Sequence, residues 1–136
     1  MEEDSIMIEI LKLYQRKYNA VSEIHRLTEE MGEFLSKNDR VSVQLIMKMR
    51  QDEMNLADKC NTSVALIESA MEQNDRNRLQ RLLENSGENN IAETFEEKKL
   101  QEIAKNIKLI LQKTIELDKR LSSRIAGNDS FYSTGK

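Results

Sequence analysis

Proline is absent from this chain of 136 residues, and glycine occurs only four times. Without proline, nothing in the sequence forces a helix to break, so long helices can form. The scattered glycines do not make the glycine-rich loop with which many nucleotide-binding proteins hold phosphates. No apolar run approaches the roughly 20 residues that a transmembrane helix needs. These absences favour long helices and argue against a nucleotide-binding site and a membrane span.

Residues suited to catalysis and metal binding are also scarce. Cys60 is the only cysteine, so no intramolecular disulfide can form, which suits a reducing compartment. His25 is the only histidine, and Ser22 stands three residues before it, so the Glu-x-x-His pair of metal sites in helical bundles is missing. A nucleophilic cysteine would also need a nearby base. We therefore expect no catalytic residue, no metal site, no cofactor and no enzymatic activity.

Aromatic residues make up only 4% of the chain, whereas charged residues make up 33%. Such a balance is typical of long helices around a narrow core of Leu, Ile, Met and Val. The net charge is −3 and no face is basic, so nucleic acid is not an expected partner. The acidic start followed by an amphipathic helix is unlike a secretory signal. We expect a cytoplasmic protein of one domain.

The dominant feature of the sequence is hydrophobic periodicity in three long stretches. Apolar residues recur there at alternating steps of three and four, the pattern of helices that pack side by side. The clearest repeat contains a single polar member and runs through Leu100, Ile103, Ile107, Ile110, Thr114, Leu117 and Leu121. The pattern predicts an all-α fold, an elongated antiparallel bundle of three long helices with coiled-coil-like packing. The helices should span about residues 5–36, 40–85 and 91–126 in a domain of residues 1–127, followed by a flexible tail of residues 128–136.

The first two stretches carry stripes of different width. On the first helix, Met7, Tyr14, Val21 and Leu35 widen the main apolar face, so this helix can touch two others at once. On the second helix the seam is narrower and contains Glu53 as a polar interruption. Its apolar members are Ile46, Met49, Leu56, Cys60, Val64, Ile67 and Met71.

Short polar segments separate the stretches. Asp39 can cap the second helix after a turn so short that the first two helices must form an antiparallel hairpin. Around Asn74 and Asp75 two alternatives stay open: the second helix runs straight through, or it bends or ends there and a short helix follows. Asn90 and Glu93 have the spacing of a capping box for the last helix, and Gly127 predicts its end.

The last helix has a second apolar stripe beside its seam, formed by Ala104, Leu111, Ile115 and Ile125. A helix docked on one hairpin needs one stripe, so two indicate either central burial or a surface left for another helix. Methionine is concentrated on the first hairpin, where it either fills the core or provides an adaptable binding surface. These methionines are Met31, Met47, Met49, Met54 and Met71.

Nearly the whole chain resembles the FlgN-type flagellar export chaperones. The resemblance lies in the hinge Leu35-Ser36-Lys37-Asn38-Asp39 followed by Leu45-Ile46 and Arg50, and in the last amphipathic helix, from Asn106-Ile107 through Leu121, with the tail Tyr132-Ser133-Thr134-Gly135. The related FliT-type chaperones share these features. The resemblance implies a cytoplasmic helical chaperone without ATPase activity. Such proteins serve flagellum biogenesis by type III secretion.

Chaperones of this family bind helical terminal segments of hook-associated (hook–filament junction) proteins, prevent their premature assembly and pass them to the export machinery. Their C-terminal helix is important for cargo binding. Carried over to this chain, the partner-binding residues are Leu111, Ile115, Leu121, Ile125, Phe131 and Tyr132. This reading predicts a monomer or weak dimer. The alternative is a structural or adaptor coiled-coil protein that uses the same stripe to form a homo-oligomer.

Overall fold

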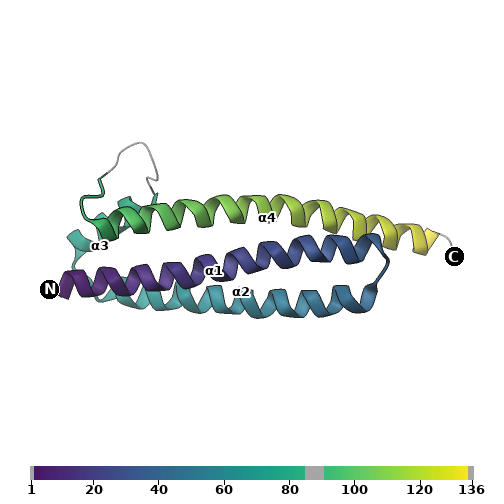
Figure 1. Ribbon diagram of the computed structural model, residues 1–136, viewed down its shortest axis with the longest axis horizontal. Helices are drawn as coiled ribbons and strands as arrows, with labels where there is room; N and C mark the ends of the chain where they lie inside the picture. Colours follow the sequence, from purple (N-terminus) through teal and green to yellow (C-terminus); the bar gives the residue numbers. More distant parts are fainter. Residues whose placement is uncertain (1, 85–90, 135–136) are drawn as a thin grey trace.

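The computed structural model describes the backbone of residues 2–84 and 91–134 and the side chains of residues 5–84 and 91–124. Within these ranges the elements are helices: α1 (Glu2–Ser36), α2 (Arg40–Ser69), α3 (Gln73–Glu84) and α4 (Phe95–Thr134). Figure 1 shows α1, α2 and α4 side by side along the long axis, with α2 running opposite to the other two. The all-α class is confirmed for the described residues. Four helices, and not the predicted three, are found in this part of the chain.

Helix α1 occupies the middle of the molecule. It packs along α2 and along α4, whereas α2 and α4 have few close backbone contacts with each other among the described residues. Its buried side chains cover two adjoining faces, because a stripe this wide can pack against a helix on each side. They are Ile10, Leu13, Ala20, Val21, Ile24, Leu27, Thr28 and Met31. The width of the stripe therefore explains the central position of α1.

The turn between α1 and α2 is as short as predicted. Asn38 has a φ of 57°, and the amides of Asn38 and Asp39 donate to the carbonyls of Leu35 (3.1 Å) and Phe34 (2.9 Å). This is the arrangement of a Schellman motif, which ends a helix with one residue in the left-handed region. Asp39 then caps α2, since its carboxylate accepts from the Ser42 amide at 3.1 Å. The hairpin thus turns on two polar residues.

The predicted second helix of residues 40–85 is wrong in its extent, because α2 ends at Ser69 and α3 begins at Gln73. The guanidinium of Arg76 folds back over this break and donates to the carbonyls of Glu68 (3.0 Å) and Met71 (3.1 Å). The last carbonyls of a helix have no partner inside it. The Glu68 carbonyl accepts from the Met71 amide and from Arg76, which also bonds the Met71 carbonyl beyond the end of α2. Of the two alternatives left open by the sequence, the interrupted helix is the one found.

The interruption lets α3 cover the end of the molecule at which α1 and α4 begin (Figure 1). Leu79 of α3 belongs to a core cluster with Ile10 of α1 and Leu100 of α4. Leu82 is completely buried as well. A straight continuation of α2 would carry both leucines past the end of the bundle into solvent, and burial of a leucine contributes about 1.5–3 kcal/mol. The change of direction is therefore favoured by the core.

The last helix starts later than the predicted residue 91, because a different capping box is used. Asn90 lies outside the described residues, and Glu93 precedes the helix. Thr94 caps α4: its hydroxyl accepts from the Glu97 amide at 3.1 Å, and the Glu97 carboxylate accepts from the Thr94 amide at 3.2 Å. These reciprocal bonds define a capping box. The sequence contains the same signal, Thr94 followed three residues later by Glu97.

The last helix also ends later than predicted. The backbone continues in helical conformation through Gly127 to Thr134, where the sequence predicted an end at residue 126 and a flexible tail. Glycine inside a helix costs about 1 kcal/mol relative to alanine, which lowers helix stability without forcing a break, and no proline follows. Residues 135–136 of the predicted tail lie outside the described range.

The seam of α2 differs in its middle part from the predicted one. Met49 and Leu56 are 40% and 44% exposed, while Arg50 and Ala57, one position later, turn toward the other helices. The side chain of Arg50 is only 14% exposed. The prediction took Met49 as a seam residue in place of its polar neighbour Arg50. Because a heptad seam advances by seven residues in two turns, the next predicted seam residue became Leu56 in place of Ala57. Two apolar side chains assigned to the core are thus free on the surface.

Candidate functional site

Histidine and cysteine, two residue types that are often used in catalysis, have structural roles here. The His25 Nδ1 atom lies 2.9 Å from the hydroxyl of Thr114, and that hydroxyl donates its proton to the Ile110 carbonyl at 2.7 Å. The Thr114 oxygen therefore accepts from an Nδ1–H group. Cys60 is 4% exposed. In residues 2–84 and 91–134, no three His, Cys, Asp or Glu side chains are grouped to hold a metal ion.

A second polar cluster joins α2 to both neighbours. Arg50 donates through Nη1 to Oδ1 of Asp118 on α4 at 2.6 Å and to Oγ1 of Thr28 on α1 at 3.3 Å. Thr28 is completely buried, and its hydroxyl donates to the Ile24 carbonyl at 2.7 Å. Arg50 enters the sequence-based prediction only through the family resemblance, and Asp118 does not enter it. A polar residue at a core position of the α2 repeat was the available signal.

The predicted partner-binding residues do not share one surface. Ile115 is 53% exposed, whereas Leu121 is 3% exposed and packs in a core cluster with Leu27, Met31, Val43 and Ile46. Leu111 is half-buried and packs against the cluster of Val21, Ile103 and Ile107. The side chains of Ile125, Phe131 and Tyr132 lie outside the described residues. Leu121 is therefore a core residue. Ile115 is the most exposed of the predicted partner-binding residues whose side chains are described.

The Arg50–Asp118 ion pair sets the register between the two outer helices. Because α2 and α4 run in opposite directions (Figure 1), four residues onward from Arg50 correspond to four residues back from Asp118. Met54 is thus level with Thr114, between the turns that carry Leu111 and Ile115. Residues spaced by three, four or seven share a helix face. On α2, Met47 and Met54 therefore lie on either side of the ion pair. On α4, Leu111 and Ile115 both precede Asp118 and lie on the side where Met54 stands.

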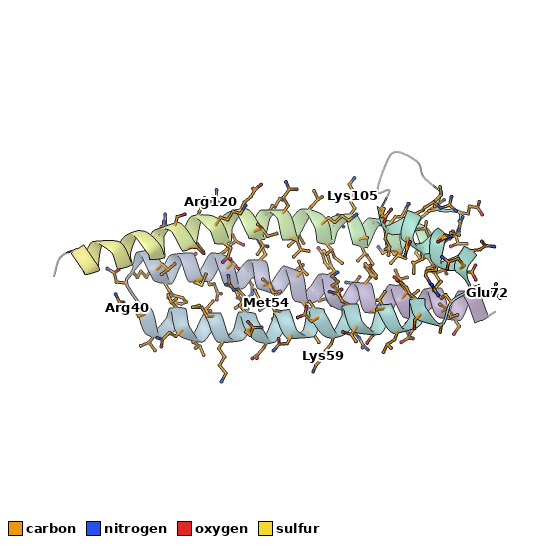
Figure 2. All side chains as sticks on the ribbon, turned by 180° about the vertical axis from the view of Figure 1, so that it is seen from behind. Arg40, Met54, Lys59, Glu72, Lys105 and Arg120 are labelled. Atoms are coloured by element: carbon orange, nitrogen blue, oxygen red, sulfur yellow. The ribbon has the colours of Figure 1, made fainter. Side chains whose placement is uncertain are left out.

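We call these four side chains the α2–α4 surface. Met47 is 47% exposed, and Met54, midway along α2 in Figure 2, is half-buried. Methionine is unbranched and adapts its shape to irregular partners. Of the other methionines on the hairpin, Met31 fills the core and Met49 is exposed. Core filling therefore explains only part of the methionine content, and half-exposed methionines stand beside a half-exposed leucine–isoleucine pair.

Apolar side chains are also exposed away from this surface. Leu45, Met49 and Leu56 are 58%, 40% and 44% exposed. Their spacings of four and seven residues place them on one flank of α2. Leu109 of α4, 47% exposed, stands six residues before Ile115 and so lies on a different face of that helix. The outer helices consequently carry more apolar surface than their packing on α1 uses.

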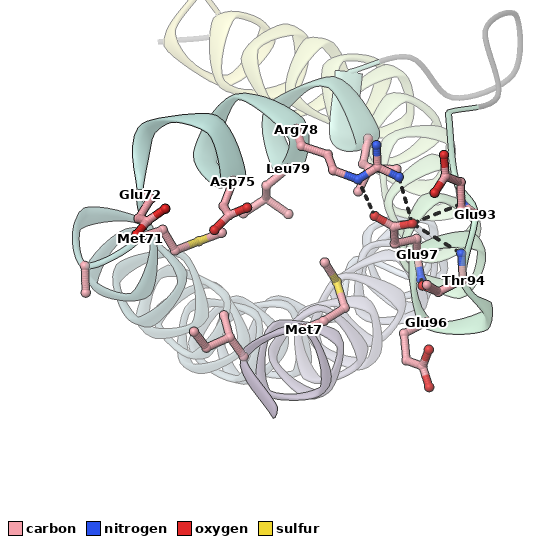
Figure 3. Close-up of a pocket in the computed structure, with 13 residues that line it drawn as sticks. Met7, Met71, Glu72, Asp75, Arg78, Leu79, Glu93, Thr94, Glu96 and Glu97 are labelled. Atoms are coloured by element: carbon pink, nitrogen blue, oxygen red, sulfur yellow. Dashed lines mark hydrogen bonds and ion pairs between the residues drawn. The ribbon is translucent and has the colours of Figure 1, made fainter. Parts of the chain in front are cut away.

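A cavity of about 520 Å³ opens at the end of the molecule where α3 lies. Figure 3 shows Met7 of α1 and Met71, from the α2–α3 junction, directed into it. On one side the wall is held by a bidentate ion pair, with Arg78 Nε and Nη2 at 2.7 and 2.9 Å from the Glu97 carboxylate oxygens. Arg78 Nη2 also donates to the Ile91 carbonyl at 2.9 Å. These bonds fix α3 against the start of α4.

Glu97 is the only charged residue that is buried among the described residues, with 6% of the whole residue exposed. The hydrogen bonds from Arg78, together with those from the amides of Glu93 and Thr94, lower its pKa to about 2 against the opposing effect of burial. The same contact raises the pKa of Arg78. Each partner stabilises the charged form of the other, so the pair remains ionised at neutral pH.

The chain matches no protein-family model, no curated protein and no solved structure. The resemblance to FlgN-type chaperones therefore stays a hypothesis, and function is inferred from the residues themselves. No helix in the described ranges combines the length and apolar character of a membrane span.

Proposed function

We propose that this protein binds an amphipathic helical segment of a partner protein on the α2–α4 surface. The observation that carries the proposal is the exposure of apolar side chains on both outer helices around the Arg50–Asp118 ion pair. An amphipathic helix places anchors three, four and seven residues apart, which matches the spacings of the methionine pair and of the leucine–isoleucine pair. The partner helix would lie over the ion pair and cover both pairs.

We further propose, from the resemblance, that the partner is a terminal segment of a flagellar hook-associated protein. The chain would then act as a cytoplasmic export chaperone that keeps this segment from assembling prematurely and presents it to the export machinery. Binding without catalysis suits a surface of flexible apolar side chains. Ile125, Phe131 and Tyr132 belong to this proposal through the resemblance alone. Leu121 is left out because it is buried.

The first test is the Ile115→Asp variant, with Leu109→Asp as the matched control. Both residues are about half-exposed on α4, at 53% and 47%, so both variants should keep the helical circular-dichroism spectrum. Ile115→Asp should lose binding at least tenfold, because a charge would be buried against the partner. Leu109→Asp should bind normally. Leu111→Asp is less informative, since Leu111 also supports the core.

Binding is measured with purified hook-associated proteins from the source organism, after a pull-down from its extract read by mass spectrometry. Recovery of such a protein by the wild type and by Leu109→Asp, with loss in Ile115→Asp, supports the chaperone function. Recovery by all three places the partner elsewhere. If no hook-associated protein binds the wild type, the flagellar assignment is refuted while the surface can still be tested with other helices.

The second candidate function is a homo-oligomeric scaffold, favoured by the exposed flank of Leu45, Met49 and Leu56. The α2 helices of two copies of the chain could pair through this flank and bury it. Light scattering after size exclusion distinguishes the two functions. A stable oligomer that Met49→Asp dissociates and Ile115→Asp leaves intact would favour the scaffold, whereas a monomer at micromolar concentration would exclude it.

A further inference from the structure

The end cavity has an apolar floor that packing leaves uncovered. Met7 and Met71 are half-buried beside the core cluster of Ile10, Leu79 and Leu100. Ile6, 37% exposed, lines the same cavity. The volume of about 520 Å³ falls within the range of about 300–1,000 Å³ that is usual for ligand pockets. The floor therefore offers space and apolar contacts for more than one side chain.

The edge of the cavity is strongly acidic. Glu72 and Asp75 of the α2–α3 junction line one side, and Glu93 and Glu96, near the start of α4, line the other. Figure 3 shows the Asp75 carboxylate on the cavity side of α3. Within the described residues no ion pair joins these four carboxylates to a basic side chain. Arg78 is paired with Glu97, and the charge of Glu93 acts on it more weakly. The potential at the opening is therefore negative.

We propose that this cavity is a second binding site, which takes a partner segment of alternating apolar and basic residues. An aliphatic side chain of the partner would enter between Met7 and Met71, while lysine or arginine beside it would meet the carboxylates of Glu72 and Asp75. Lysine and arginine also have apolar stems that can lie along the floor below a charged head. The proposal does not depend on the α2–α4 surface.

Other occupants fit the site less well. An acidic or phosphorylated segment would meet four carboxylates of the same charge, which is unfavourable. A purely apolar segment would bring no countercharge to a rim that already carries unpaired carboxylates. A purely basic segment would leave the methionine floor uncovered. The combination of an apolar floor and an acidic rim thus selects a segment that is apolar and basic at once.

The test uses the full-length protein with ¹³C-labelled methionine methyl groups, which are seven in number. Met7→Leu and Met71→Leu variants assign the two signals from the cavity, and Met47 and Met54 report on the α2–α4 surface. The probes are three capped peptides of four residues: alternating leucine and lysine, alternating leucine and glutamate, and alternating serine and lysine. The leucine–lysine peptide should shift the Met7 and Met71 signals to saturation, and the other two should not.

The rim is tested with the double variant Glu72→Gln/Asp75→Asn. Exposed ion pairs contribute little individually, so we expect the leucine–lysine peptide to bind about three- to tenfold more weakly. The matched control is Glu29→Gln/Glu33→Gln, which neutralises two exposed carboxylates near the C-terminal end of α1, away from the cavity. This control variant should bind the peptide normally. Thermal melts establish that both variants fold.

Four outcomes would overturn the proposal: no saturable shift of the Met7 and Met71 signals, equal binding of the leucine–glutamate or serine–lysine peptide, equal weakening in both double variants, or shifts confined to Met47 and Met54. The last outcome would instead support the α2–α4 surface. Failure of the cavity proposal is thereby distinguishable from failure of the proposed chaperone function.

Discussion

At the scale of single residues, Glu97 combines three contacts in one carboxylate. It receives both bonds of the Arg78 fork, the amide of Thr94 in the capping box and the amide of Glu93 at 3.0 Å. Charge-assisted bonds of this kind are about twice as strong as neutral ones. The side chain is 8% exposed, so water competes little for these contacts. One carboxylate therefore connects α3, the segment before α4 and α4 itself.

This arrangement predicts acid sensitivity. The pKa of Glu97 is lowered from 4.5 to about 2 on folding, so its contribution is fully present above pH 4.5 and is lost as the pH falls toward 2. The contribution is about 3 kcal/mol at most. Urea unfolding at pH 7 and pH 3 should show a smaller loss of stability for Glu97→Gln than for the wild type. Equal losses in both proteins would mean that other carboxylates dominate.

At the scale of helices, the Arg50–Asp118 pair is the clearest direct link between α2 and α4. Arg50 is mostly buried, whereas the side chain of Asp118 is 42% exposed. Removal of Asp118 leaves a poorly solvated guanidinium without its anion, which is more costly than removal of both partners. The pair therefore has more influence on the register of the two helices than on net stability.

A double-mutant cycle tests this view. Asp118→Ala should destabilise the wild type by about 1–2 kcal/mol, and it should cost clearly less in the Arg50→Met background, where no charge is left unpaired. The expected coupling is about 1 kcal/mol, measured by urea unfolding. If Asp118→Ala costs the same in both backgrounds, the two side chains do not interact appreciably in solution.

Much of the fold was predictable from periodicity and caps, and the deviations have local causes. The end of α1, the Asp39 cap and the wide face of α1 follow from spacing alone. The predicted seam of α2 was displaced by one position in its middle part because Arg50, a polar residue, occupies a core position. The start of α4 was predicted too early because two capping boxes lie four residues apart and the first was chosen, whereas the bonds from Arg78 to Glu97 favour the second. Such long-range contacts leave no periodic signal in a sequence.

At the scale of the whole molecule, the candidate binding residues come from separate helices. Ile115 was predicted from the second stripe of the last helix, and it is exposed. Leu121 was assigned to the same surface but lies on the seam, where it packs with Val43 and Ile46. The contribution of Met47 and Met54 required the register between α2 and α4, which only the structure supplies. The end cavity likewise depends on the change of direction before α3.

The turn at Asn38 and Asp39 has a consequence for the order of folding. Contacts between α1 and α2 form across a very short loop, whereas α4 reaches α1 from far along the chain, with His25 and Thr114 separated by 89 residues. Local contacts form early and distant ones late, so the hairpin should form first and α4 should dock last. By the same reasoning α4 should detach first in the native state.

Native-state hydrogen exchange would test this order, with lower opening free energies expected for amides of α4 than for those of α2. Equal opening energies along both helices would show a single cooperative unit instead. If α4 does open first, the buried seam that includes Leu121 becomes transiently accessible without unfolding of the hairpin. The helix that carries Ile115 would then be the part of the protein that a partner can remodel at least cost.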